Sequence, residues 1–323
     1  MGVPYPTDTV RVVSDGEPII CVLGDYAWDV LIRTNTELLR GGDTFGEVVL
    51  LPGGSAANVA VWAARCGREV TFIGKIGRDR MGALGREDLE GEGVDHRLIE
   101  TDAHATGSVA VFVDHTGERS MVSGHGADFY LLPSELPRRA IDSAAHLHLT
   151  AWSFFTDPPR SAAREAARTA KAGGSTVSFD PGSFQMIDEM GVDAFLSVTT
   201  DMGVDLFLPN KEEASVLTGI ADPEAAGRRL VELFGGALVV LKLDAEGALV
   251  VDGDTISHIP PSSNRLVDAT GAGDSFAGAF LSRWTVGISA SESASFAVRV
   301  AEWVIGHPGA RPAPDLALRS VLG

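Results

Sequence analysis

The feature that most restricts the fold of this chain is a regular alternation of short apolar segments with longer helical ones. Between residues 143 and 208 the expected order is strand 146–150, helix 158–172, strand 176–180, a helix near 192–198 and strand 205–208. Strands that alternate with helices form a parallel sheet whose two faces are covered by those helices. The sequence therefore predicts an α/β protein, a three-layer α/β/α sandwich with a mainly parallel central sheet.

A different pattern interrupts this alternation in the first half of the chain. Residues 109–122 read as a strand, a turn and a second strand, and residues 45–50 read as a strand of a partly exposed sheet. These segments are expected to form a small β-sheet lid. The predicted organisation is a flexible tail at residues 1–17, one domain at residues 18–323, and lid insertions at about residues 31–51 and 105–125.

The charge balance limits the partners of the protein. Its 323 residues include 26 Lys and Arg against 44 Asp and Glu, a net charge of −18. This balance argues against nucleic acid or an anionic membrane as a partner. An anionic nucleotide would need a local positive site, which a helix start and a magnesium ion can supply. The sequence contains no run of 18 apolar residues and no signal-peptide core, so we expect a cytoplasmic protein.

A glycine-rich stretch near the end of the chain carries the clearest chemical signal. The segment DATGAGD at residues 268–274 opens a long apolar helix. Small residues at a helix start let backbone N–H groups approach an anion, and the helix dipole adds partial positive charge there. Asp274 would repel such an anion. Its presence makes sense if it takes a proton from a hydroxyl that attacks a phosphoryl group.

Two nucleotide-binding motifs are excluded for this stretch, and one structural interpretation stays open. The Gly-Lys-Ser/Thr ending of a phosphate-binding P-loop is missing. The dinucleotide-binding pattern G-x-G-x-x-G is met by Gly271 and Gly273 but has Phe276 at its third position. The remaining structural interpretation is a helix start at which small residues permit close helix packing.

Two segments far apart in the chain resemble the signatures of one enzyme family. DATGAGD is similar to the C-terminal signature of the ribokinase-like (PfkB) family of carbohydrate and nucleoside kinases, and PGGSAANVA at residues 52–60 is similar to its N-terminal signature. The resemblance runs from about Ile19 to about Pro314. It implies the ribokinase-like fold, the cofactors ATP and Mg²⁺, a role for K⁺, and a homodimer formed through the β lid.

An aspartate near the first strand is a candidate for binding the substrate. Residues 19–23 form a buried apolar run, and ligands of open α/β sheets bind beyond the carboxyl ends of such strands. The Asp29 carboxylate can accept hydrogen bonds from hydroxyls, and its position resembles that of the sugar-binding aspartate of ribokinase-like enzymes. Asp25 is interpreted as a turn residue.

The N-terminal signature adds further acceptor residues by resemblance. Gly53, Gly54 and Asn58 line the acceptor pocket in the family. Asn58 is expected to begin a helix among small apolar neighbours, so it needs a buried partner such as a sugar hydroxyl. Arg119 is a further candidate for the acceptor, against the alternative of an exposed hairpin arginine.

The resemblance also implies the nucleotide and cation sites. Asp274 is the base, and the N–H groups of its preceding turn stabilise the charge that develops on the transferred phosphoryl group. The residues of that turn are Gly271, Ala272 and Gly273. The residues implied for ATP and Mg²⁺ are Asn210, Glu213, Lys242, Asp244 and Gly247. The residues implied for a cage around a monovalent cation are Asp268, Thr270, Val304, His307 and Gly309.

Three positions depart from the pattern of the family. Asp244 stands where relatives usually have glycine, in a loop beside the nucleotide phosphates. His125 stands where related sugar kinases carry an arginine. No acidic residue follows Thr150, where ribose-specific relatives carry one, which argues against ribose as the acceptor.

The predicted function is ATP-dependent phosphorylation of a hydroxyl, the primary alcohol of a small sugar. A nucleoside kinase of the same fold and a catalytically silent sugar-binding relative are the alternatives. Aromatic rings near two strand ends bear on the first alternative, because they could stack on a nucleobase; they are Tyr26, Trp28, Trp152, Phe154 and Phe155. Tyr26 and Trp28 are expected to point away from the pocket if Asp29 faces it.

Overall fold

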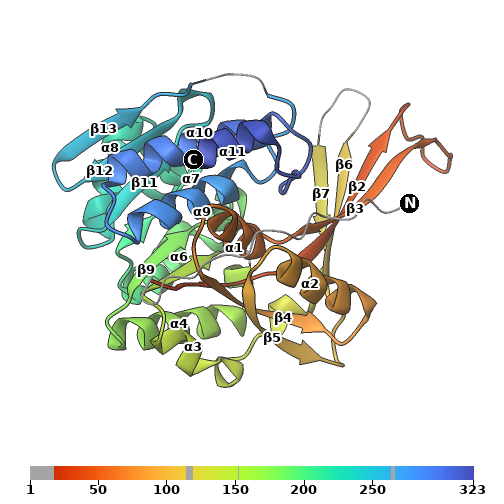
Figure 1. Ribbon diagram of the computed structural model, residues 1–323, viewed down its shortest axis with the longest axis horizontal. Coiled ribbons are helices and arrows are strands. Elements are labelled where there is room, and N and C mark those ends of the chain that lie inside the picture. Colours follow the sequence, from red (N-terminus) through yellow and green to blue (C-terminus); the bar gives the residue numbers. More distant parts are fainter. Residues whose placement is uncertain (1–17, 114–118, 152, 263–265) are drawn as a thin grey trace.

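A nine-stranded sheet forms the centre of the protein (Figure 1). The structure is a computed structural model that describes residues 18–113, 119–151, 153–262 and 266–323, so the predicted tail lies outside the described residues. The strands are β1 (Ile20–Leu23), β4 (Val70–Gly77), β5 (Asp95–Thr101), β8 (His146–Thr150), β9 (Thr176–Asp180), β10 (Leu206–Phe207), β11 (Leu238–Lys242), β12 (Ala248–Asp252) and β13 (Thr255–Ile259). Their order is β13-β12-β11-β10-β9-β8-β1-β4-β5, and only the pairs β11–β12 and β12–β13 are antiparallel.

Helices cover both faces of this sheet, which confirms the predicted three-layer sandwich. One layer contains α1 (Ser55–Arg65), α2 (Arg80–Gly91), α9 (Ala272–Trp284), α10 (Ala290–Ile305) and α11 (Leu316–Leu322). The other contains α3 (Arg138–Asp142), α4 (Pro159–Ala172), α5 (Phe184–Met190), α6 (Val192–Thr199), α7 (Lys211–Thr218) and α8 (Pro223–Leu233). Alternate residues of β1 enter the two cores: Ile20 and Val22 the first, Cys21 and Leu23 the second.

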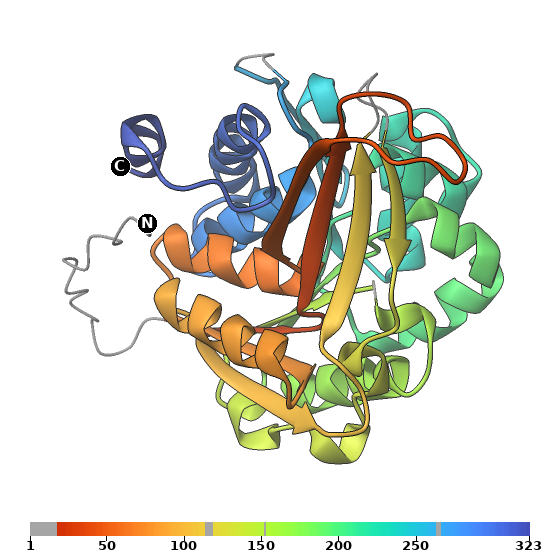
Figure 2. The ribbon, with the colours of Figure 1, turned by 90° about the vertical axis from the view of Figure 1, so that its right-hand side faces the viewer.

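A separate four-stranded sheet stands beside the sandwich. Its strands are β2 (Ala27–Thr34), β3 (Gly46–Gly53), β6 (Gly107–Val113) and β7 (Arg119–Ser123), in the order β3-β2-β6-β7. Figure 2 shows this small sheet face on, with β2 and β3 in red and β6 and β7 in yellow. Because β2 begins at Ala27, Asp29 lies on a strand of the small sheet rather than in a loop before it.

The start of α1 differs from the expected one. The helix begins at Ser55, not at Asn58, and the preceding Gly54 has φ 89°. A methyl group on Gly54 would lie 2.6 Å from the carbonyl oxygen of Asp25, so only glycine lets the chain pass this close. Asn58 is therefore in the first turn of α1 and points from the helix start toward the sheet edge where the polar residues gather. Within the described part of the chain, no helix is long and apolar enough to span a membrane.

Candidate active site

Polar residues follow the carboxyl ends of five neighbouring strands. Asp25 follows β1, Thr150 ends β8, Asp180 ends β9, Asn210 follows β10 and Lys242 ends β11. Thr150 Oγ1 donates to Asp25 Oδ1 at 3.4 Å, and Lys242 Nζ lies 2.5 Å from Asp180 Oδ2. This edge of the sheet is where ligands of open α/β folds bind.

The first turn of α9 places Asp274 over this edge. Gly271 precedes the helix in the left-handed conformation, with φ 73°, and a methyl group there would lie 2.6 Å from the Cα of Ala310. Gly278, one turn further on, lets α9 approach α1: a methyl group on it would lie 2.6 Å from the Val59 carbonyl oxygen. The close helix packing that the sequence left open is therefore present in this segment, and anion binding at the same helix start stays a prediction.

Two side chains of α1 hold the Asp274 carboxylate. Ser55 Oγ donates to Oδ1 at 2.8 Å, and Asn58 Nδ2 donates to Oδ2 at 2.7 Å. Burial, together with the charges of Asp180 and Asp25, raises the pKa of Asp274 to about 6. The two hydrogen bonds act in the opposite direction and lower it. A carboxylate with a pKa near neutrality is suited to accept a proton and release it again.

If Asp274 is the base of an enzyme, as the sequence predicts, activity should fall on the acid side of neutrality. A base works only in its ionised form, so kcat should drop by about tenfold per pH unit well below pH 6. A kcat profile between pH 5 and 8, with circular dichroism at each pH as a control for folding, measures this. A flat profile down to pH 5 in folded protein would contradict the assignment of Asp274.

Asp29 faces Gly53 across the small sheet, where β2 pairs with β3. A methyl group on Gly53 would lie 2.6 Å from Asp29 Oδ2, so the carboxylate rests directly against this glycine. Burial raises the pKa of Asp29 to about 6, although the positive charge of Arg311 acts to lower it. No hydrogen bond from the described residues reaches this carboxylate. Its oxygens are thus available to accept from hydroxyls of a ligand.

Asp25 has a larger role than the turn residue expected from the sequence. Its carboxylate accepts from the backbone N–H groups of Ser55 at 2.9 Å and Ala56 at 3.1 Å, which belong to the first turn of α1. A capping residue from 30 positions earlier in the chain replaces the usual local cap. Asp25 thereby fixes the helix start that carries Ser55 and Asn58.

A pocket of about 490 Å³ opens beside Asp274, between the start of α9 and the carboxyl ends of β10 and β11. Its lining residues include the predicted nucleotide residues Asn210, Lys242, Asp244 and Gly247, the turn residues Ala272 and Gly273, and apolar side chains such as Leu266, Phe276 and Val298. A methyl group on Gly273 would lie 3.5 Å from Lys242 Nζ, so a cation stands beside the helix start. The pocket combines an apolar wall with a positive end.

The predicted nucleotide residues Asn210, Glu213 and Lys242 lie in a buried polar cluster together with Asp180. Asn210 and Glu213 cap α7 reciprocally: Asn210 Oδ1 accepts from Glu213 N, and Glu213 Oε2 accepts from Asn210 N, each at 2.8 Å. Burial, followed by the charge of Asp180, raises the pKa of Glu213. Burial acts to lower the pKa of Lys242, but the charges of Asp180 and Glu213 outweigh it and raise that pKa. Lys242 is therefore a fixed positive charge rather than a surface lysine.

The backbone at position 244 has a conformation that favours glycine. Asp244 has φ 50°, in the left-handed region that favours glycine, and it is the only non-glycine residue of the described chain with positive φ. Its carboxylate lies 3.0 Å from Lys211 Nζ. Asp244 thus adopts a turn conformation that favours glycine, and Lys211 pairs with its charge at the rim of the pocket.

The residues predicted for a cation cage come together in part. Asp268 Oδ1 accepts from Thr270 N at 2.8 Å, and Asp268 Oδ2 accepts from Gly309 N at 3.0 Å, which joins the stretch before α9 to the C-terminal turn. The Val304 carbonyl accepts from His307 N at 2.9 Å. No cluster of three or more His, Cys, Asp or Glu side chains able to hold a metal occurs in the described ranges, so a cation here would rely on backbone oxygens.

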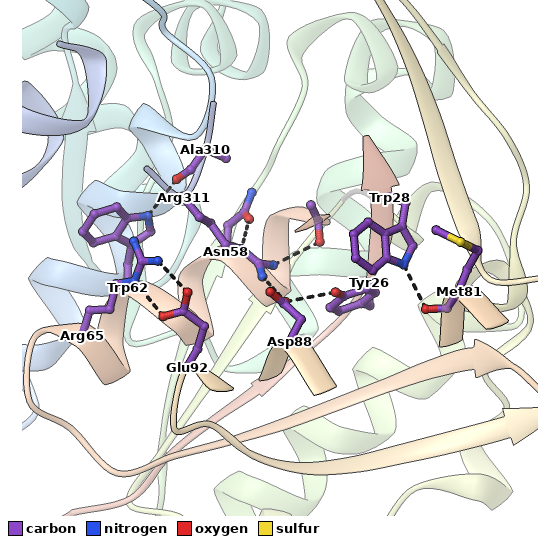
Figure 3. Close-up of polar contacts among 11 residues, drawn as sticks. Tyr26, Trp28, Asn58, Trp62, Arg65, Met81, Asp88, Glu92, Ala310 and Arg311 are labelled. Atoms are coloured by element: carbon purple, nitrogen blue, oxygen red, sulfur yellow. Dashed lines mark hydrogen bonds and ion pairs between the residues drawn. The ribbon is translucent and has the colours of Figure 1, made fainter. Parts of the chain in front are cut away.

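The aromatic residues near the strand ends pack into the protein. Figure 3 shows Tyr26 and Trp28 directed toward α2: Tyr26 Oη donates to Asp88 Oδ2 at 3.0 Å and Trp28 Nε1 donates to the Met81 carbonyl at 3.0 Å. Both side chains are therefore engaged with α2, and their orientation relative to an acceptor stays a prediction. Phe154 and Phe155 pack against Phe195, and Trp152 lies outside the described residues.

Arg119, predicted for the acceptor, and His125, a departure from the family pattern, are the remaining positions that the sequence singled out. The side chain of Arg119 lies outside the described part of the structure. The His125 ring stacks on Phe129 with a centroid distance of 4.4 Å.

Arg311 is the site residue that sequence reasoning missed. It follows the turn at residues 306–310, and its guanidinium reaches Asn58, Asp88 and the carbonyl of Gly53 (Figure 3). The sequence held one signal that could have found it: an arginine between two prolines after the second family motif, in the segment PGARP at residues 308–312.

Known proteins share both the sequence pattern and the architecture of this chain. The sequence pattern described as pfkB family carbohydrate kinase matches residues 20–316. The chain is 33% identical to the ATP-dependent ribose-1-phosphate kinase of Halopiger xanaduensis, over 90% of this chain and 93% of that protein. It is 31% identical to a fructokinase of Escherichia coli, over 84% and 87% of the two chains. The structure is similar to that of adenosine kinase from Sinorhizobium meliloti, with a TM-score of 0.84, 26% identity and coverage of 94% and 99%.

The match to the family runs from β1 through the C-terminal turn and ends at the first residue of α11. It covers both segments that carry the resemblance and the helix start at Asp274. The predicted fold and enzyme class are confirmed, and this chain belongs to the pfkB family of carbohydrate kinases.

Proposed function

We propose that this enzyme transfers a phosphoryl group from ATP to the primary hydroxyl of a small sugar, with Asp274 as the base. The observation that carries the proposal is the position of the Asp274 carboxylate. It lies at the start of α9, oriented by Ser55 and Asn58, beside a pocket whose wall includes Lys242.

The chemistry follows from these positions. An ionised carboxylate has more acceptor sites than the two that Ser55 and Asn58 occupy, so Asp274 can also accept the proton of the acceptor hydroxyl. As that proton leaves, the hydroxyl oxygen bonds to phosphorus and the bond to ADP breaks. The charge that develops on the phosphoryl group would be stabilised by Lys242 and by the N–H groups of Gly271 and Gly273. The third predicted donor, the N–H group of Ala272, donates to the Ala269 carbonyl at 3.3 Å.

The pocket fits a nucleotide with magnesium. Apolar side chains such as Phe276 and Val298 suit an adenine ring, and Lys242 stands at the end where phosphates would meet α9. Asp180 and Glu213 supply carboxylate oxygens close together, the ligands that Mg²⁺ takes alongside phosphates. Mg-ATP supplies the phosphoryl group when it is bound.

The acceptor side favours a sugar over a nucleoside. Asp29 offers a carboxylate that can accept from several hydroxyls, whereas the rings of Tyr26, Trp28 and Phe154 are engaged in contacts within the protein. The small sheet, which carries Asp29 and Gly53, would cover a small acceptor and exclude water. The relatives named as ribose-1-phosphate kinase and fructokinase support the same class.

Release of ADP across a panel of sugars, sugar phosphates, sugar acids and nucleosides tests the proposal. We expect the highest kcat/KM for a free hexose, pentose or sugar acid. A value for adenosine, cytidine or inosine about tenfold above that for every sugar would establish a nucleoside kinase instead.

Potassium should raise the rate if the C-terminal turn holds a cation. Backbone oxygens around Asp268, Thr270, Val304, His307 and Gly309 would supply its ligands, and the bond from Gly309 N to Asp268 already joins the two segments. The measurement is kcat in potassium against choline at fixed ionic strength. Equal rates in the two salts would remove the cation from the proposal.

A further inference from the structure

Arg311 is a buried cation whose hydrogen bonds all go to the protein. Its side chain is 2% exposed. Nε donates to Asn58 Oδ1 at 2.6 Å, Nη1 donates to Asp88 Oδ2 at 2.6 Å, and Nη2 donates to the Gly53 carbonyl at 3.2 Å. Tyr26 Oη shares the Asp88 oxygen. Figure 3 shows the guanidinium between Asn58 and Asp88. The planar fork of donors is thus fixed from three sides.

This arrangement determines which way the Asn58 amide faces. A guanidinium carries donors and no acceptor, so the Asn58 atom beside Arg311 must be its carbonyl oxygen. The amide nitrogen is then directed to the other side, where it donates to Asp274 Oδ2 at 2.7 Å. Without Arg311 the amide would lose the contact that fixes its oxygen end, so it could rotate and its N–H group could move out of line with Asp274 Oδ2.

We propose that Arg311 is a positioning residue for phosphoryl transfer: by holding the Asn58 amide it keeps the Asp274 carboxylate oriented as the base. The inference rests on the proposed role of Asp274. Arg311 does not touch Asp274 through any hydrogen bond, and the chain of contacts runs Arg311, Asn58, Asp274. An effect of Arg311 on the orientation of the base must therefore pass through Asn58, whereas its bond to Gly53 and its charge near Asp29 would act on the acceptor side and change the KM for the acceptor.

A second arginine offers a matched control in the same region. Arg65 donates to Glu92 at 2.8 and 2.6 Å and to the Pro312 carbonyl at 2.9 Å, and its side chain is 9% exposed. It ties the residue after Arg311 to α1, as Figure 3 shows for its pair with Glu92, but its bonds lead away from the base. Loss of Arg65 should loosen the same turn without freeing the Asn58 amide.

The experiment is a double-mutant cycle in kcat, measured at saturating ATP and acceptor. Arg311→Met should lower kcat by about tenfold with an unchanged KM for ATP, because misorientation loses part of the 10²- to 10⁴-fold that a base contributes. In the Asn58→Ala background the same change should lower kcat by less than about twofold, because the intermediary is already gone. Arg65→Met should lower the thermal midpoint and leave kcat within about twofold.

Two results would overturn the positioning role. In the first, Arg311→Met lowers kcat by the same factor in the Asn58→Ala background as in the wild type. In the second, Arg65→Met lowers kcat as much as Arg311→Met does. If Arg311→Met does not fold, Arg311→Lys, which keeps the charge but not the fork, replaces it in the same cycle. Asp274→Asn is measured alongside. Full turnover in Asp274→Asn would contradict the role of Asp274 as the base. An inactive Asp274→Asn together with a normal kcat in Arg311→Met would contradict the positioning role alone.

Discussion

Replacement of Asp274 by asparagine is expected to lower kcat by roughly 10²- to 10⁴-fold while the protein stays folded and binds ATP. An amide has nearly the shape of the carboxylate but cannot take a proton from the acceptor hydroxyl. Asp274 is held by only two described hydrogen bonds, from Ser55 and Asn58, and burial already disfavours its charge. Removal of that charge should therefore do little harm to the fold.

Single-turnover kinetics and calorimetry with ATP separate the two halves of this expectation. The dissociation constant for ATP should change little, because the pocket residues Asn210, Lys242 and Phe276 remain in place. The acid limb of the kcat profile should also disappear with the group that titrates. Near-wild-type turnover in Asp274→Asn would show that the proton goes elsewhere.

The second large effect is expected at the acceptor. Asp29→Ala removes a carboxylate that no described donor occupies, so the binding of a sugar loses one charged hydrogen bond, worth about 1.5–3 kcal/mol. This corresponds to a roughly 10- to 150-fold weaker acceptor affinity. The affinity for ATP should not follow, because Asp29 lies on the small sheet and does not line the nucleotide pocket.

Glu47→Ala is the matched control for this variant. Glu47 is a carboxylate on β3 of the same small sheet, but it is exposed and paired with Arg33. Calorimetry with the best acceptor from the substrate panel should show the loss in Asp29→Ala only. Unchanged sugar affinity in Asp29→Ala, or an equal loss in Glu47→Ala, would contradict the role of Asp29.

The layers of the fold could be predicted because their signals are local. The apolar run before Gly24 and the alternation after residue 143 each fix an element and the face that it buries. Asp274 could be singled out for the same reason, since its neighbours along the chain carry the glycine-rich pattern that predicts an anion-binding turn. Strand β10 shows the limit of such local signals. The apolar segment predicts a strand at residues 205–208, but only two residues form it.

The rest of the site depends on contacts between distant parts of the chain. Asp25 reads as a turn residue because its partners, at the start of α1, lie 30 positions away, and no local cap marks that start. Arg311 is joined to Asn58 across 253 positions. A charged side chain after a proline turn reads as exposed until the fold shows what surrounds it.

The packing of α9 and the C-terminal turn against α1 has a consequence during synthesis. The base is on α9, its two partners come from residues 55 and 58, and Arg311 follows some 250 residues later. If Asp274 is the base, a nascent chain can form β1 and the small sheet long before α9 and the C-terminal turn are available to join them. The contacts that orient Asp274 would therefore form late in synthesis.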